Sequence, residues 1–137
     1  MLIYKLFFLT IILIKKISSI CRNLTGSAFS IQALFLSENV LVDIDSEQNG
    51  EEINNSIGLK TSKMVERFRC RDCGSPVFAR LGNKIIAVPL SVFDPAVLRL
   101  EKWQVTTHLH YSNRIIDIND DTPKHLNGNR SPLFVNK

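Results

Sequence analysis

Apolar and polar residues alternate with a period of two in several short stretches of the chain. The clearest stretch is 28–36, where every second position is apolar: Phe29, Ile31, Ala33 and Phe35. Successive side chains of a β-strand point to opposite faces of a sheet, so this spacing predicts a strand.

Weaker versions of the same pattern predict further strands at 40–44, 64–69, 77–80, 84–88, 104–111 and 114–118. Gly74-Ser75-Pro76 and Leu81-Gly82-Asn83 are typical of turns between strands, and Asp94-Pro95 is typical of a turn or a single helical turn. The polar residues 45–62 predict a loop. After residue 16 no stretch has a sustained helical period, so we expect a mainly β fold of mostly antiparallel sheets.

The N-terminal residues differ from this pattern. Residues 6–14 are almost entirely apolar, with Lys5 before them and Lys15-Lys16 after them. The run is shorter than the roughly 20 residues that span a bilayer, and it has no small-residue cleavage motif. Three interpretations stay open: a secretory signal or anchor, a buried strand or helix, or a wrongly assigned start of the reading frame.

With 137 residues, 45% of them hydrophobic, the chain is expected to form one compact core. The expected organisation is an apolar leader over 1–16, a β domain over 17–126 and a loose tail over 127–137. The net charge of +4 comes from Lys and Arg residues scattered along the chain, so no specific nucleic-acid partner is expected. Association with a membrane is expected only if the leader is functional.

The cysteines carry the sharpest local signal. Cys70 and Cys73 have the Cys-x-x-Cys spacing and precede Gly74, an arrangement in which two thiolates can bind one zinc ion. A redox dithiol and inert thiols are the alternatives, although no βαβ pattern of the thioredoxin type surrounds the motif. Three cysteines do not form a disulfide framework, which favours a cytoplasmic location. A functional leader would instead direct the chain to a membrane or the secretory pathway.

His108 and His110 lie two apart in a predicted strand, so their rings are expected on the same face of the sheet. Such a pair can bind a metal, and it can equally form a polar or solvent-facing strand face.

Trp103 is expected in the core, and His125 is expected to be structural or solvated. The acidic residues of the following segment are interpreted as turn and loop residues: Asp117, Asp120 and Asp121.

Four pieces in order resemble the glutathione-dependent formaldehyde-activating enzyme and centromere protein V family over about residues 18–126. They are Cys21-Arg22, the segment 26–30, the segment 67–76 and His108-Leu109-His110-Tyr111 followed by Pro123. The resemblance implies a coiled, mostly antiparallel β fold with two zinc ions and carbon-sulfur lyase activity. Formaldehyde and glutathione, as co-substrate, would combine into S-hydroxymethylglutathione, so the implied partner is a small thiol adduct.

The resemblance also assigns residues. It implies a structural zinc bound by Cys70 and Cys73 together with two cysteines of an N-terminal Cys-x-Cys-Gly, and an active-site zinc of which Cys21 is the remaining ligand. The chain departs from this pattern, because Lys16 and Ser18 occupy the other two active-site positions and the Cys-x-Cys-Gly segment is absent. The second zinc is therefore expected to bind weakly or not at all.

Two functions follow from these observations. The first is a zinc-dependent carbon-sulfur lyase of the S-hydroxymethylglutathione synthase type that is impaired in this chain. The second is a non-enzymatic, zinc-stabilised interaction module of the centromere protein V type, with the basic residues Arg67, Arg69 and Arg71 as its partner surface. A secreted protein with oxidised Cys70 and Cys73 would in addition require a functional leader.

Overall fold

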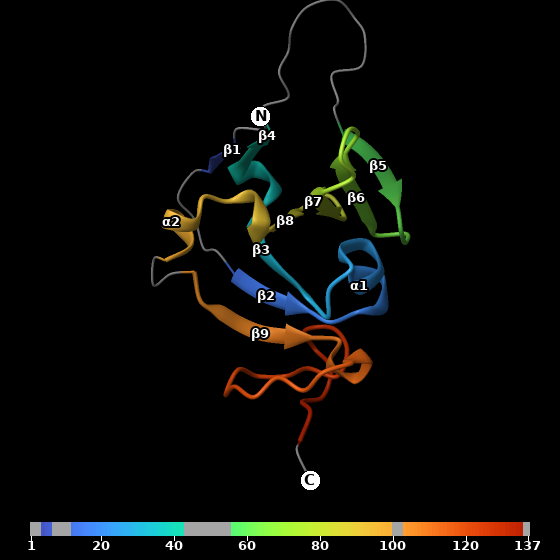
Figure 1. The fold of residues 1–137 in the computed structure, drawn as a ribbon, viewed down its shortest axis with the longest axis vertical. Coiled ribbons are helices and arrows are strands. Elements are labelled where there is room, and N and C mark those ends of the chain that lie inside the picture. Colours follow the sequence, from blue (N-terminus) through green and yellow to red (C-terminus); the bar gives the residue numbers. More distant parts are fainter. Residues whose placement is uncertain (1–3, 7–11, 43–55, 100–102, 136–137) are drawn as a thin grey trace, which may run out of the picture. The chain divides into compact units, whose positions relative to one another are not determined.

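The computed structural model describes residues 4–6, 12–42, 56–99 and 103–135 and is mainly β (Figure 1). Its strands are β1 (Tyr4–Leu6), β2 (Ile12–Lys16), β3 (Ser30–Leu36), β4 (Val40–Val42), β5 (Ser56–Lys60), β6 (Val65–Cys70), β7 (Pro76–Leu81), β8 (Ile85–Pro89) and β9 (Val105–Leu109). The helices are α1 (Ser19–Thr25) and α2 (Pro95–Leu98), with short 3₁₀ turns at Ser37–Asn39, Leu90–Val92 and Tyr111–Asn113.

The strands form a mixed seven-stranded sheet in the order β5-β6-β7-β8-β3-β2-β9 and a separate two-stranded sheet of β1 and β4. The chain divides into two compact units. Unit 1 comprises Met1–Thr10 and Leu34–Val88, and unit 2 comprises Ile11–Ala33 and Pro89–Lys137. Within the described residues, no helix is long and apolar enough to cross a membrane.

In unit 1, antiparallel hairpins join β5 to β6, β6 to β7 and β7 to β8. Phe68 and Phe78 face each other across β6 and β7, and their rings stack with centroids 4.3 Å apart. Gly58 of β5 lies close to this pair, since a Cβ atom there would lie 3.0 Å from the Phe68 ring. The buried side chains Val77, Ala79 and Ile86 to Val88 complete the core of this unit.

In unit 2, β2 runs parallel to β9, with Lys15 opposite His108 and Lys16 opposite Leu109. Leu13 and Ile14 are buried, so the end of the apolar N-terminal run is a core strand. The other residues of Ile12–Lys16 are exposed or half-buried, with Ile12 47% exposed, and residues 1–3 and 7–11 lie outside the described residues. The parallel pairing also makes the sheet mixed, where mostly antiparallel strands were expected.

The segment that follows β9 folds back along it (Figure 1). The amide of His108 donates to the Pro123 carbonyl at 2.8 Å, and the amide of His125 donates to the His108 carbonyl at the same distance. His110 N donates in turn to the carbonyl of Asn127 at 2.7 Å. These bonds cover the backbone edge of β9, which would otherwise be open to another strand.

Two expectations from the sequence are wrong in detail. Residues 114–118 form no strand, because Arg114 turns onto the rings of Tyr111 and Phe134 and leaves Ile115 and Ile116 exposed. The expected loop 45–62 contains the strand β5, and its residues up to 55 lie outside the described residues. Near the C-terminus, where a loose tail is expected, Leu126 N donates to Pro132 O and Phe134 N to Lys124 O.

Candidate functional site

The carboxyl ends of β2 and β9 lie side by side, because these two strands are parallel. Lys16 ends β2, and Ser18 and Cys21 follow at the start of α1. His110 follows β9, and the amide of Ile17 donates to the carbonyl of Leu109 at 3.1 Å. The sequence positions that the resemblance assigned to an active site are therefore gathered around one end of the parallel pair.

Helix α1 begins and ends on local signals. Ser18 is its N-cap, and the Ser18 hydroxyl oxygen accepts a hydrogen bond from the Cys21 amide at 3.2 Å. Gly26 ends the helix with φ 65°, a left-handed conformation that suits glycine. Cys21 is buried, with 3% of its surface exposed. The Ser18 side chain thus serves the helix, and Cys21 faces the interior of unit 2.

Arg22 links the two strand ends. Its Nη1 donates to the carbonyl of Ile17 at 3.1 Å and to the carbonyl of Asn113. Ile17 follows β2 and Asn113 follows β9, so one guanidinium group holds both connections. Charge-assisted hydrogen bonds of this kind are stronger than those between neutral groups.

His110 has an unusual backbone conformation. It is the only non-glycine residue with positive φ (61°) in the described parts of the chain. Such conformations carry strain in residues other than glycine. Burial, and then the charge of Lys16, lower the pKa of His110 below its usual value, so this ring is neutral at neutral pH.

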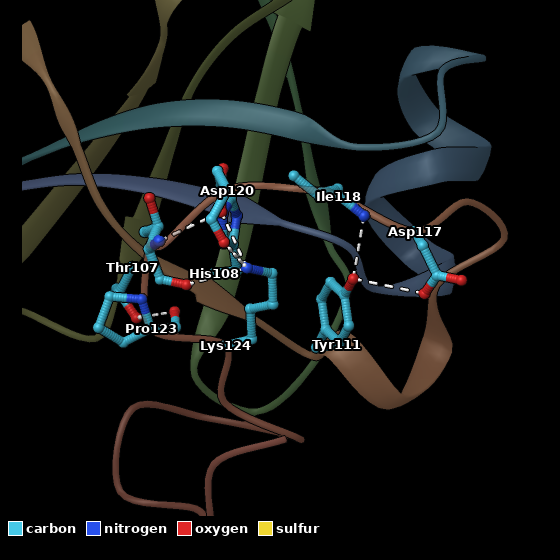
Figure 2. Close-up of polar contacts among 9 residues, drawn as sticks. Thr107, His108, Tyr111, Asp117, Ile118, Asp120, Pro123 and Lys124 are labelled. Atoms are coloured by element: carbon cyan, nitrogen blue, oxygen red, sulfur yellow. Dashed lines mark hydrogen bonds and ion pairs between the residues drawn. The ribbon is translucent and has the colours of Figure 1, made fainter. Parts of the chain in front are cut away.

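His108 lies on β9 and is completely buried. Figure 2 shows its ring facing the Asp120 carboxylate: His108 Nε2 lies 3.0 Å from Oδ1 and 2.9 Å from Oδ2. Lys124 Nζ donates to Asp120 Oδ1 at 2.9 Å and also to the Asp120 carbonyl. We call His108, Asp120 and Lys124 the His108 cluster.

The protonation states of the His108 cluster follow from its surroundings. Burial lowers the pKa of His108; the hydrogen bond and charge of Asp120 oppose this shift, and the charges of Lys15 and Lys124 add to it. The ring is then neutral, with Nε2–H donating to the carboxylate. Burial would raise the pKa of Asp120, but hydrogen bonds from Lys124 and His108, the charge of Lys124 and, at acid pH where the ring is protonated, the charge of His108 lower it to about 2. Asp120 is therefore ionised.

Tyr111 anchors the rest of the C-terminal segment, as Figure 2 also shows. Its side chain is buried, its hydroxyl accepts from the Ile118 amide at 3.0 Å, and it donates to Asp117 Oδ1 at 3.5 Å. The Phe134 ring lies 5.0 Å from the Tyr111 ring, centroid to centroid, and the Arg114 guanidinium lies over both rings. A hydrogen bond from Arg114, followed by its charge, lowers the pKa of Asp117.

Cys70 and Cys73 lie in unit 1, on the turn that joins β6 to β7. The turn is closed by Gly74 N donating to the Cys70 carbonyl at 3.0 Å and by Cys70 N donating to the Ser75 carbonyl at 2.9 Å. Cys73 is exposed and its thiol donates to Ser75 Oγ at 3.3 Å. Hydrogen bonds from Ser75, then one from the Cys70 thiol, lower the pKa of Cys73. We call residues 70–75 the thiol turn.

Neither set of residues matches a complete zinc site. The thiol turn supplies two thiolates, half of a four-ligand structural site, and among the described residues no third His, Cys, Asp or Glu joins them. At the carboxyl ends of β2 and β9, Lys16 and the helix-capping Ser18 occupy two of the three assigned positions, and Cys21 supplies the one thiol, which is buried. His108 Nδ1 and Trp103 Nε1 are buried and have no hydrogen-bond partner in the part of the chain that the structure describes.

The structure places the predicted residues in three settings. Cys70 and Cys73 lie together on one turn, Cys21 is buried in α1, and His108 and His110 do not share a strand face because β9 ends at Leu109. Trp103 is buried, as expected, and His125 bonds the Ser131 carbonyl through Nδ1.

The sequence reasoning missed α1, Arg22, Asp120 and Lys124. Ser18 and Gly26, the two caps with seven helical residues between them, were the signal for the helix.

The sequence of this chain is similar to that of a known protein family. No curated protein matches the chain significantly. The family described as glutathione-dependent formaldehyde-activating enzyme matches residues 16–113, from the last residue of β2 to the turn after β9. The matched residues include the carboxyl ends of β2 and β9, the thiol turn, His108 on β9 and His110 just after β9. They cover well over half of the sequence, and the chain therefore belongs to the glutathione-dependent formaldehyde-activating enzyme family.

Proposed function

We propose that this chain binds the adduct of formaldehyde and glutathione at the carboxyl ends of β2 and β9. The reaction is of the carbon-sulfur lyase type: the bond between the glutathione sulfur and the formaldehyde carbon forms or breaks. The family match carries the proposal, because it begins at Lys16 and ends at Asn113, the two sides of this region. The membership supports the reaction class, and the residues at the strand ends support the proposed location.

The charges of the region support an anionic ligand. Lys16 is close enough to His110 to lower the pKa of that ring, and Arg22 holds the two connections beside it. Glutathione carries two carboxylates, which a lysine at this position would attract. The neutral His110 ring is available to exchange a proton with a thiol or a hydroxymethyl group.

We further propose that the reaction is slow in this chain. The amine of Lys16 and the hydroxyl of Ser18 are poor ligands for zinc compared with thiolates, and the Ser18 oxygen already accepts the Cys21 amide. The residues present do not suit a zinc ion at the strand ends. Zinc binding at Cys70 and Cys73 is a separate part of the proposal, and it requires ligands from outside the thiol turn.

The test is the rate at which formaldehyde exchanges with glutathione, measured by exchange NMR with and without the protein. We expect a small acceleration over the uncatalysed exchange by the natural chain. The double variant Lys16→Cys, Ser18→Cys in the presence of zinc should be faster by at least about tenfold, because restored thiolates bind a Lewis-acidic zinc ion. Adding Cys21→Ser to this variant should remove the gain.

Two results would contradict the proposal. If neither chain accelerates the exchange and neither broadens the adduct's NMR signals, the adduct is not the ligand. If the natural chain is already as fast as the double variant, the region is not impaired. Loss of binding in Lys16→Ala, with unchanged thermal stability, would further locate the ligand at the end of β2.

A second candidate function is a non-enzymatic, zinc-stabilised interaction module. Its supporting observation is the exposure of several side chains of unit 1: Arg69 and Arg71 are exposed, and Leu59 and Met64 are 43% and 67% exposed. Such a module would bind a protein partner with no effect on formaldehyde exchange. The exchange measurement therefore distinguishes the two functions.

A further inference from the structure

The C-terminal segment forms a small hairpin after it has met β9. Leu126 N donates to the Pro132 carbonyl at 3.0 Å. The tip is closed by a tight turn, in which Ser131 N donates to the Gly128 carbonyl at 2.9 Å. Asn127 lies between these two bonds and is exposed, and Gly128 is half-buried. The Asn127-Gly128 pair therefore lies at a bent, water-accessible place in the chain.

The backbone of Asn127 is held on both sides, whereas its side chain is held weakly. Its N–H donates to Ser131 Oγ at 2.8 Å, and its carbonyl accepts the His110 N–H at 2.7 Å. Among the described residues, the side-chain amide has one hydrogen bond, a long one of 3.4 Å from Ser112 Oγ to Oδ1. A bond of this length adds little restraint, so the amide group can turn toward the backbone of the next residue.

Gly128 offers a backbone nitrogen that no side chain shields. In the described parts of the chain, no carbonyl accepts its N–H. Its φ lies outside the left-handed range, and a Cβ atom here would meet no atom within 4 Å beyond its chain neighbours. The fold therefore does not need glycine at this position. Glycine nevertheless gives the backbone the freedom to bring the Gly128 nitrogen up to Asn127 Cγ.

We propose that the Asn127-Gly128 pair is a site of spontaneous deamidation, at which the backbone rearranges to an isoaspartyl linkage. The Gly128 nitrogen loses its proton to hydroxide and attacks Asn127 Cγ. The side-chain nitrogen takes up protons from water and leaves as ammonia, and a cyclic succinimide remains. Water then adds to one ring carbonyl and breaks its bond to the Gly128 nitrogen. Opening at Cγ gives an ordinary aspartyl residue, and opening at the backbone carbonyl gives the isoaspartyl linkage; no oxidant or reductant is involved.

The isoaspartyl product changes the support of His110. The main chain then runs through the former side chain of Asn127, and the carbonyl that accepts the His110 N–H becomes part of a free carboxylate. A negative charge thus arises beside the backbone of His110, whose ring also feels the charge of Lys16. This consequence rests on the proposed function. The converted chain should bind the anionic glutathione adduct about threefold more weakly than the fresh chain.

The experiment incubates the full, folded chain in mildly alkaline buffer and removes samples over several weeks. Trypsin releases residues 125–130 as one peptide, since Lys124 and Arg130 flank it. Tandem mass spectrometry measures the fraction of this peptide in which Asn127 has exchanged its side-chain NH₂ for OH. An isoaspartyl methyltransferase with labelled S-adenosylmethionine counts the isoaspartyl linkages. We expect both signals to rise together, and faster at higher pH, because the attacking nitrogen must lose its proton.

Gly128→Ala is the matched variant, because the structure has room for its methyl group. It should deamidate at Asn127 at least about tenfold more slowly, since a Cβ atom restricts the approach of the backbone nitrogen. Its circular dichroism and urea midpoint should equal those of the natural chain. Asn129 is the control within the same peptide: it is exposed but followed by Arg130, so it should keep its amide. A second Asn-Gly pair, Asn49-Gly50, lies outside the described residues and is quantified in its own peptide.

Two results would overturn the inference: an Asn127 amide that persists in the folded chain while the urea-denatured chain deamidates, or equal rates in the natural chain and Gly128→Ala. Neither result affects the formaldehyde exchange assay, because that assay uses freshly purified protein. A chain that deamidates at Asn127 but binds no adduct, fresh or converted, would contradict the proposed function and leave the modification site standing. The two failures are therefore distinguishable.

Discussion

The His108 cluster and the thiol turn are both built from groups that can ionise or bind metals, yet their surroundings are opposite. In the first, a buried imidazole, a carboxylate and an ammonium group bond one another within unit 2, and His108 Nδ1 has no partner among the described residues. In the second, a half-buried and an exposed thiol lie on one turn of unit 1, and the Cys73 thiol donates to Ser75 Oγ. The first is held by partners from within the chain, and the second is open to solvent.

This difference indicates separate roles. A buried network with matched partners stabilises one conformation and is costly to disturb. An exposed pair of donors contributes little to the fold and is open to ligands. The four predictions below test this contrast, beginning with the change that should affect the fold most.

The largest effect is expected from ending the chain after Asn113, where the family match also ends. This truncation removes Asp120 and Lys124, the partners of Tyr111, and the hydrogen bonds along β9. The loss should exceed the roughly 5 kcal/mol that separates many domains from unfolding, so the product should be unfolded. Circular dichroism and Trp103 fluorescence measure this outcome.

A matched control for the truncation is Leu133→Ala, which changes an exposed side chain in the same segment and should alter stability by no more than about 0.5 kcal/mol. A truncated chain that unfolds cooperatively, at the same urea concentration as the full one, would show that the C-terminal segment is dispensable.

The next effect is that of Asp120→Ala. It leaves the buried His108 Nε2–H without an acceptor, which should reduce the free energy of unfolding by about 2 kcal/mol. Urea denaturation measures the change. Asp121→Ala, at the exposed neighbouring position, is the control and should differ from the natural chain by less than about 0.5 kcal/mol. Equal effects of the two variants would mean that the cluster does not stabilise the fold.

The pH dependence of stability should show two windows. His108 and His110 have lowered pKa values in the folded chain, so below about pH 6.5 the unfolded chain takes up protons first and stability falls. Asp120, with a pKa of about 2 against about 3.9 when unfolded, gives a further loss between about pH 4 and 2. Urea midpoints across this range test both. Asp120→Asn should reduce the second loss, of which Asp117 keeps a part, and should deepen the first, because Asp120 opposes the lowering of the His108 pKa.

The smallest effect is expected at the thiol turn. In the metal-free chain, Cys70→Ser should change the free energy of unfolding by less than about 0.5 kcal/mol, because Cys70 is only half-buried and the turn residues after it are exposed. Cys21→Ser, in the buried position, should cost about 1–2 kcal/mol. Alkylation followed by mass spectrometry should modify Cys73 first and Cys21 only after unfolding. Equal alkylation rates for the three thiols would remove the contrast between the regions.

Short-range patterns made the mainly β fold predictable. Strands β3, β6, β7, β8 and β9 lie within a few residues of the stretches where alternation and turn residues place them. The pairing of β2 with β9 was not predictable, because these strands are nearly 90 residues apart and no local signal specifies a parallel partner. The strand β5 was missed because it directly follows a polar stretch and has glycine at its centre, where Gly58 lies close to the Phe68 ring.

The candidate site divides in the same way. Cys70, Cys73 and Gly74 form a local motif, so the thiol turn was visible in the sequence. Asp120 was interpreted as a turn or loop residue and Lys124 was not singled out, since nothing local connects them to His108 twelve or more positions earlier. Their role becomes clear only when the chain folds back along β9. Arg22 likewise donates to the backbone carbonyls of Ile17 and Asn113, which are far apart in the sequence.

The left-handed backbone of His110 has a consequence for protein engineering. Glycine at this position would relieve strain on the order of 1 kcal/mol, so a screen for thermal stability alone should select His110→Gly. A screen that also demanded formaldehyde exchange should reject the same substitution if the imidazole takes part. Two libraries selected under these different conditions would therefore differ in the residue found at position 110. The difference would measure what the imidazole ring contributes to formaldehyde exchange.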